Sequence, residues 1–196
     1  MDVEITLDVI CSWSYVGFTR FRRAADRARA EGRDVTTRFR PFELAPGAPT
    51  DGVPLLDAIR FAFGDHGVEA TARVIPIAAA EGLVLNYEKG IATGTFDAHR
   101  LIAQADAQGL GEDMVERLFR AHFTDGLHVG DPDTLARLAA EVGVVWDGAA
   151  GTGELRAALD KVRDEGVRGV PMFAFAGGPT LTGAVGEGDL SAALAA

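Results

Sequence analysis

The sequence predicts an α/β fold whose sheet-forming unit is interrupted by an all-helical insertion. Strand-like patterns fall near the two ends of the 196-residue chain, at residues 3–9, 35–44, 170–175 and 180–183. From about residue 54 to about residue 142 the apolar residues recur at helical spacing, so no strand is expected there. The Pro- and Gly-rich stretch at 45–52 separates these two kinds of pattern and predicts a boundary.

The N-terminal region predicts a strand, a helix and a second strand. Residues 3–9 alternate apolar and polar side chains, which predicts a strand with one buried face. From Ser12, a suitable N-cap, apolar residues recur about one turn apart and predict a helix that exits at 31–34. The β-branched and aromatic residues of 35–44 predict the second strand, so the three elements form a βαβ unit with a right-handed crossover.

The middle of the chain predicts helices only. The stretch 82–94 is expected to be a loop, and Pro76 is expected to kink or split the helix that contains it. The predicted helices are 55–63, 68–81, 96–108, 112–123 and 132–142, the last capped by Asp131 with Pro132 in its first turn.

The C-terminal region predicts a helix at 154–164, strands at 170–175 and 180–183 joined by a Gly177-Gly178 hairpin, and a final helix at 187–195. The elements of the two ends follow the order of a thioredoxin fold, which is strand, helix, strand at the N-terminal end and helix, strand, strand, helix at the C-terminal end. We therefore predict a thioredoxin-like fold with an all-helical insertion. Its domains are 1–50 with 144–196, and 51–143.

Composition restricts the partners. The net charge is −10 and the pI about 4.8, which argues against binding to nucleic acid or to an anionic membrane surface. No stretch approaches the about 18 apolar residues of a membrane helix. The single cysteine cannot form an internal disulfide, which suits a reducing compartment, and a cytoplasmic location is expected.

Cys11 lies where the first strand gives way to the first helix. Free backbone N–H groups and the positive end of the helix dipole favour a thiolate there, so we expect a pKa below the free-cysteine value of about 8.5. The alternative interpretation is a small buried hydrophobic residue, as most lone cysteines are.

Six segments together carry a resemblance that spans nearly the whole chain. They are Asp8–Tyr15 (DVICSWSY), Arg40–Leu44 (RPFEL), Ala98–Leu101 (AHRL), Ala121–Phe123 (AHF), Gly166–Phe173 (GVRGVPMF) and Leu181–Ala184 (LTGA). The chain resembles the DsbA-like thioredoxin family. Within it, the chain looks like the FrnE-like branch, which is similar to 2-hydroxychromene-2-carboxylate isomerases and kappa-class glutathione transferases.

The resemblance implies a cis peptide bond before Pro171 that faces Cys11. The exposed backbone of Val170 would then pair with an extended thiol substrate or with glutathione. The alternative interpretation of Pro171 is a proline in an edge strand. Cys11 and Ser14 are the expected catalytic residues, and Ser12, Trp13, His99, Val170 and Pro171 are expected to bind substrate.

Ser14 is the main departure from the redox members of the branch, which carry Cys-x-x-Cys. Without a resolving thiol, intramolecular dithiol chemistry is excluded. The isomerases and transferases instead have Ser at the position of Cys11. Ala45 and Gly94 replace polar residues that are common in the family, which suggests a pocket for a less polar substrate. A serine introduced to trap a mixed disulfide would give the same sequence.

We predict thiol-dependent enzyme chemistry at Cys11, with two enzymatic functions and one non-enzymatic function to consider. One is a monothiol oxidoreductase (Cys-x-x-Ser) that attacks a disulfide or a small electrophile. Another is an isomerase or transferase that uses glutathione or a similar small thiol on a small aromatic or enone substrate, as in polyketide metabolism. The third is a binding protein without redox activity. No tightly bound cofactor is expected, and a homodimer is compatible with the resemblance.

The four histidines show no metal-ligand spacing, and no metal site is expected. His66, His99, His122 and His128 are each expected to be structural or exposed. Of these, His99 lies in a segment that matches the family.

Overall fold

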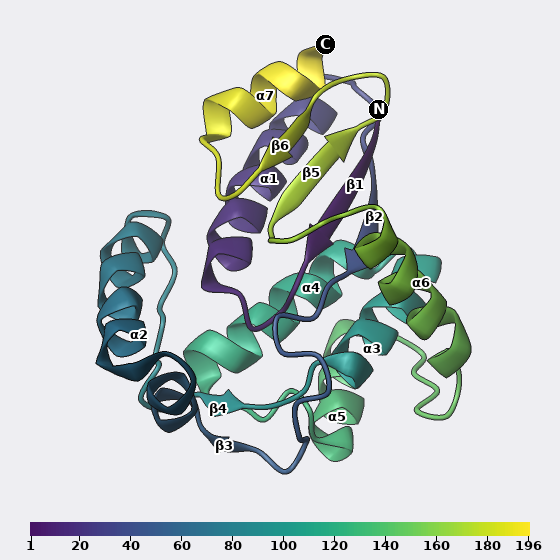
Figure 1. Ribbon diagram of the computed structural model, residues 1–196. Coiled ribbons are helices and arrows are strands. Elements are labelled where there is room, and N and C mark those ends of the chain that lie inside the picture. The colour runs from purple at the N-terminus through teal and green to yellow at the C-terminus, as the bar shows by residue number, and fades with distance from the viewer.

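The computed structural model describes residues 1–196, and its centre is a four-stranded mixed sheet (Figure 1). The strand order is β2-β1-β5-β6. β1 pairs in parallel with β2 and antiparallel with β5, and β5 pairs antiparallel with β6. The two ends of the chain thus share one sheet, as predicted. The strands are β1 (Asp2–Leu7), β2 (Thr36–Pro41), β5 (Met172–Phe175) and β6 (Thr180–Thr182).

Three helices from the two ends of the chain pack beside the sheet. α1 (Ser12–Ala30) and α7 (Glu187–Ala195) contact each other, and α6 (Thr152–Asp164) runs next to β2 and contacts α3 (Figure 1). The predicted helices at both ends are confirmed. The predicted strand 35–44 is shorter in the structure, because the chain leaves the sheet after Pro41.

The insertion is almost entirely helical. It contains α2 (Leu55–Ala80), α3 (Phe96–Ala107), α4 (Gly111–Arg120), the π-helical turn η1 (Ala121–Asp125) and α5 (Pro132–Val142). The expectation of no strand was wrong in one detail, since β3 (Val53–Pro54) pairs antiparallel with β4 (Ile91–Ala92). Two residues are too few to show a periodicity in the sequence. The division into 1–50 with 144–196 and 51–143 stays a prediction, and one cluster of buried side chains draws on both segments.

α2 changes direction at Gly64, whose φ of 65° and ψ of −165° are not helical. This break falls in the gap between the predicted helices 55–63 and 68–81. The additional kink or split expected at Pro76 is not found, because the only non-helical residue within α2 is Gly64. Glycine adopts positive φ without steric penalty, so the turn forms there.

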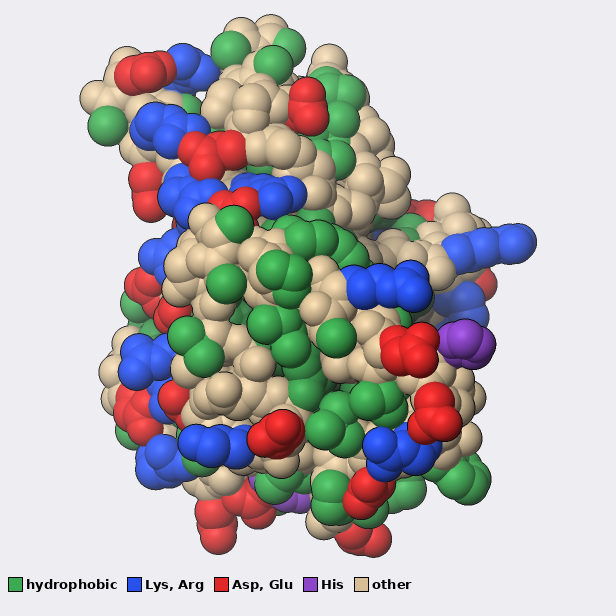
Figure 2. Space-filling model, turned by 90° about the vertical axis from the view of Figure 1, so that its left-hand side faces the viewer, with side chains coloured by type: hydrophobic (Ala, Val, Ile, Leu, Met, Phe, Trp, Pro, Cys, Tyr) green, Lys and Arg blue, Asp and Glu red, His purple; other side chains and the backbone are tan.

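The side of the molecule that carries α2 shows hydrophobic side chains along its middle, flanked by charged ones (Figure 2). On α2 itself, Phe61, Phe63 and Ile75 are exposed. None of the helices combines the length and apolar character that crossing a membrane requires.

The C-terminal end of β1 is buried on both faces. Thr6 and Asp8 are fully buried, although the alternation in the sequence predicted a polar, exposed face. The prediction failed because the loop after β2 and helix α3 cover this end of the strand. The backbone N–H of Leu44 donates to Asp8 Oδ2 at 2.7 Å, and His99 of α3 lies against the same carboxylate. This covered end of β1 leads directly to Cys11.

Candidate active site

Cys11 is the N-cap of α1. Its backbone is extended, and Sγ accepts a hydrogen bond from the Ser14 N–H at 3.4 Å. The prediction that Ser12 caps this helix was therefore wrong by one residue. A sulfur in this position faces the free N–H groups of the first helical turn, which favour negative charge.

Val170 faces the same sulfur from the segment before β5. The Cys11 thiol donates to the Val170 carbonyl oxygen at 3.7 Å, and the Val170–Pro171 peptide bond is cis. The predicted cis bond and its position opposite Cys11 are confirmed. The Val170 N–H donates no hydrogen bond within the chain, so it is free to pair with a ligand.

Gly17 allows Pro171 to pack closely against α1. A Cβ added at Gly17 would lie 2.9 Å from Pro171 Cγ, closer than real Cβ atoms come to a neighbour. The absence of a side chain at Gly17 therefore allows the close approach of Pro171, the residue after Val170, to α1.

Burial raises the pKa of the Cys11 thiol above its usual value, and the negative charge of Asp8 adds to this effect. Hydrogen bonding from Ser14 lowers the same pKa but does not outweigh burial. The expectation that the Cys11 pKa lies below the free-cysteine value was therefore wrong. Cys11 is only 8% exposed, and desolvation disfavours a thiolate more than the helix N-terminus favours it.

Ser14 is fully buried next to the thiol. The nearby Ser14 hydroxyl lowers the pKa of the Cys11 thiol, although burial outweighs this effect. In the structure the Ser14 hydroxyl oxygen has no hydrogen-bond partner. A buried hydroxyl without a partner is unusual in a folded protein. This oxygen is therefore available to a sulfur that moves or becomes charged during a reaction.

Tyr87 completes the surroundings of Cys11, and no pattern in the sequence pointed to it. It comes from the predicted loop 82–94 and is buried, with its ring edge-on to Phe123 at a centroid distance of 5.9 Å. Burial raises the pKa of Tyr87, the nearby Cys11 raises it further, and hydrogen bonding to the Ser12 side chain lowers it. Ser12 is half-buried beside Tyr87, whereas Trp13 points outward and is 43% exposed.

Asn86 holds this loop in place. Its backbone N–H donates to the Phe123 carbonyl at 2.6 Å, and its Nδ2 donates to the Thr124 carbonyl at 2.7 Å. Both acceptors belong to η1. The insertion therefore presents Tyr87 to Cys11 from a fixed position.

His99 makes no hydrogen bond to the Cys11 sulfur. Its Nε2 donates to the Phe42 carbonyl at 2.9 Å, and Asp8 Oδ1 lies 3.4 Å from the same nitrogen without forming a hydrogen bond. His99 also borders a cavity of about 320 Å³ between β2, α3 and α6, which Cys11 does not line. His99 thus contacts the segment that follows β2 through the Phe42 carbonyl. Its expected role in substrate binding stays a prediction.

His122 is a second residue whose importance the sequence did not show. It lies in η1, is fully buried, and neither ring nitrogen has a hydrogen-bond partner. Desolvation lowers the pKa of His122 to about 4, and the charge of Asp8 opposes this shift. The ring is therefore neutral at physiological pH. Single-turn π-helices occur frequently at functional sites.

The remaining histidines lie apart from Cys11. His66 is almost fully exposed, and His128 lies 3.1 Å from the Thr93 hydroxyl. No group of three or more His, Cys, Asp and Glu side chains is arranged to hold a metal ion. The groups that the structure brings together around the Cys11 sulfur are those of Ser12, Ser14, Tyr87 and Val170.

Comparison with known proteins shows the family of this chain. The family profile of DSBA-like thioredoxin domains matches residues 2–195. The chain belongs to this family. A probable DsbA oxidoreductase from Streptomyces coelicolor is 31% identical, with a TM-score of 0.85 over 99% of this chain and 88% of that one. The predicted DsbA-like resemblance and the thioredoxin-like fold are thus confirmed.

Two solved structures of lower sequence identity share the fold. One is the cytosolic disulfide reductase DsbM from Pseudomonas aeruginosa with GSH, which is 23% identical. Its TM-score is 0.63 over 89% of this chain and 85% of that chain. The other is a 2-hydroxychromene-2-carboxylate isomerase, 17% identical, with a TM-score of 0.60 over 94% and 89% of the two chains. The same fold therefore supports redox and isomerisation chemistry, and the residues at the site must decide between them.

Proposed function

We propose that this DSBA-like protein is a monothiol oxidoreductase in which Cys11 is the nucleophile. The Cys11 thiolate attacks one sulfur of a disulfide, so that a new S–S bond to Cys11 forms and the old S–S bond breaks. The displaced thiolate leaves and takes up a proton. A small external thiol such as glutathione then attacks the mixed disulfide and releases Cys11.

The position of the Cys11 sulfur carries this proposal. It lies 3.4 Å from the Ser14 N–H, faces the Val170 carbonyl at 3.7 Å, and stands beside a cis proline. The chain has no second cysteine to resolve a mixed disulfide internally. An external thiol is therefore required for turnover.

Val170 supports the binding of an extended thiol substrate. Its N–H is unused within the chain, and its carbonyl is held only by the Cys11 thiol. When the sulfur enters a mixed disulfide, it loses its proton and releases this carbonyl. Both groups of Val170 would then pair with the backbone of a peptide-like thiol.

Desolvation makes the resting thiol a weak nucleophile, because burial raises the pKa of Cys11. Two features compensate once reaction begins. The Ser14 N–H already points at the sulfur, and the Ser14 hydroxyl has no competing partner. Both donors stabilise charge that develops on the sulfur as it becomes thiolate or leaving group.

Incubation with glutathione disulfide followed by intact-mass measurement tests the proposal. We expect one glutathione per chain, removed by excess reduced glutathione, and none on Cys11→Ser. A chain that stays unmodified after long incubation with excess glutathione disulfide would contradict it.

A second candidate is a thiol- or glutathione-dependent isomerase or transferase for a small aromatic or enone substrate. Tyr87 favours it, because its hydroxyl stands beside Ser12 and Cys11 and can donate a proton or a hydrogen bond to a substrate oxygen. In that reaction a thiol adds to the enone carbon, a bond rotates or a proton shifts, and the thiol leaves. Cys11→Ser would keep glutathione-dependent turnover on an enone panel if this candidate were correct. A cytoplasmic location and a homodimer also stay predictions.

A further inference from the structure

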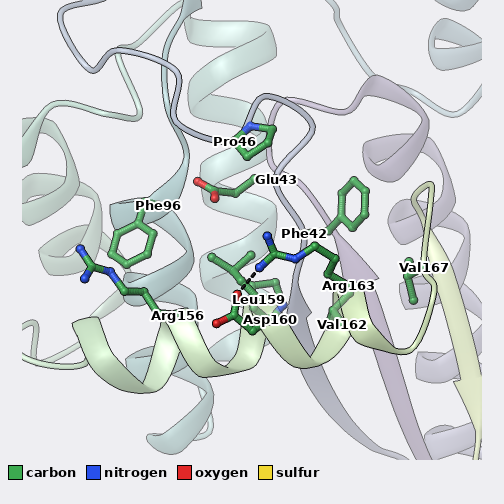
Figure 3. A pocket seen from close by; sticks show the side chains of 11 residues that line it. Phe42, Glu43, Pro46, Phe96, Arg156, Leu159, Asp160, Val162, Arg163 and Val167 are labelled. Atoms are coloured by element: carbon green, nitrogen blue, oxygen red, sulfur yellow. Dashed lines mark hydrogen bonds and ion pairs between the residues drawn. The ribbon is translucent and has the colours of Figure 1, made fainter.

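A second site lies beside α6, away from the Cys11 sulfur. A cavity of about 510 Å³ opens between the loop that follows β2 and one face of α6 (Figure 3). This volume is in the range of small-molecule sites in proteins. Cys11, Ser12, Ser14 and Tyr87 do not line it. The cavity is therefore distinct from the surroundings of the thiol.

The walls of this cavity are mainly apolar. Phe42 and Phe96 come from opposite sides, and Leu159 and Val162 of α6 form the floor between them (Figure 3). Such a surface favours a flat or branched apolar group of a ligand, because its burial removes apolar area from water.

Four charged side chains line the cavity, and two of them neutralise each other. Arg163 and Asp160 form an ion pair one turn apart on α6. Arg156 has no acidic partner within 4.0 Å, and its guanidinium instead lies 5.9 Å from the centre of the Phe96 ring. The Glu43 side chain makes no hydrogen bond or ion pair in the structure, and the charged groups that act on it are His99 and Asp8.

Glu43 and Arg156 are thus opposite charges that share one cavity without pairing with each other. Both lie toward the Phe96 end, while Phe42 lies at the other end (Figure 3). Glu43 is half-buried, and burial raises the pKa of its carboxyl. A bound cation would stabilise the ionised form of the half-buried Glu43 carboxyl, and a bound anion would pair with the Arg156 guanidinium.

We propose that this cavity binds a free α-amino acid with a large apolar side chain. The ligand ammonium group pairs with Glu43 and its carboxylate pairs with Arg156. The side chain extends over Leu159 toward Phe42. A ligand with only a negative or only a positive group would leave one of the two protein charges without a partner. The zwitterion satisfies both and adds no net charge to a chain that already carries −10.

L-Phenylalanine is the probe, and isothermal titration calorimetry on the full chain is the measurement. Each charge of the probe is removed in turn by 3-phenylpropanoate, which lacks the ammonium group, and 2-phenylethylamine, which lacks the carboxylate. Glycine lacks the apolar side chain. Each of the three should bind more weakly than phenylalanine by about tenfold or more, the loss expected for one charge-assisted contact or for the buried ring.

Variants of the protein remove the two protein charges one at a time. Glu43→Gln and Arg156→Gln should each weaken phenylalanine binding by about tenfold or more. Glu43→Gln should also strengthen 3-phenylpropanoate binding, because the repulsion between two carboxylates is removed. Glu88→Gln and Arg168→Gln are matched controls, since both side chains are exposed and lie outside the cavity.

Cys11→Ser separates this inference from the proposed redox function, because it should bind phenylalanine as the original chain does. No heat of binding at millimolar phenylalanine would overturn the inference. So would equal binding of phenylalanine and 3-phenylpropanoate, or binding that Glu43→Gln and Arg156→Gln leave unchanged.

Discussion

Replacing His122 by leucine should remove an acid-induced loss of stability. His122 is fully buried, its ring nitrogens have no partners, and desolvation lowers its pKa to about 4. In the unfolded chain a histidine has a pKa of about 6.5. Between these two values the unfolded chain binds a proton that the folded chain does not. Stability therefore falls as the pH drops from about 6.5 to about 4.

The size of this effect follows from the two pKa values. Linkage between pH 7.5 and pH 5 gives a loss of about 2 kcal/mol for a histidine that shifts from about 6.5 to about 4. Other groups also titrate in this range. The difference between the original chain and His122→Leu cancels their contributions, because both chains carry them. At pH 7.5 the substitution should have a small effect, since it removes two buried nitrogens that lack partners.

Urea unfolding at pH 7.5 and pH 5 is the assay, followed by circular dichroism. The original chain should lose about 2 kcal/mol more than His122→Leu over this interval. His66→Gln is the control, because His66 is almost fully exposed and should behave like the original chain. Equal losses in the original chain and His122→Leu would refute the assignment of a neutral, desolvated imidazole.

Three further predictions concern the thiol and its supports. The rate of thiol alkylation should have a pH midpoint above the free-cysteine value of about 8.5, because burial raises the pKa of Cys11. Cys11→Ala is the blank. A midpoint well below that value would show that desolvation does not dominate. Ser14→Cys should create dithiol turnover in insulin reduction, and a chain that already turns over as fast without the change would exclude the monothiol argument. Gly17→Ala should destabilise the fold by about 1–3 kcal/mol through its clash with Pro171, measured by urea unfolding. Gly188→Ala in α7, where the added methyl group meets nothing within 4 Å, should not destabilise, and equal effects would contradict the packing argument.

Local patterns were sufficient to predict the elements that carry the thiol. The alternation at residues 3–9 and the helical spacing after Ser12 placed Cys11 at a strand-to-helix junction. The resemblance then placed Pro171 opposite it in a cis bond. These features depend on short stretches of chain or on a shared family geometry. They are therefore visible before the chain is folded.

The properties of the thiol depend on contacts that the sequence does not show. Tyr87 reaches Cys11 from a loop held on η1 by Asn86, and the periodicity of the loop gave no sign of it. The covering of Asp8 by Leu44 and His99 turned an expected exposed face into a buried one. Desolvation follows from such long-range packing, so the direction of the Cys11 pKa shift could not be predicted from the helix N-terminus alone.

The proposed function requires Cys11 as the nucleophile and an external thiol as the resolving partner. The direct measurement is the rate of a thiol–disulfide exchange. The substrates are reduced glutathione and a mixed disulfide between glutathione and a small thiol. The products are glutathione disulfide and the free small thiol. The original chain should accelerate this exchange with multiple turnovers, and Cys11→Ser should fall to the rate without protein, because a neutral hydroxyl lacks the nucleophilicity of a thiolate. Turnover by Cys11→Ser at a rate comparable to the original chain would contradict the account.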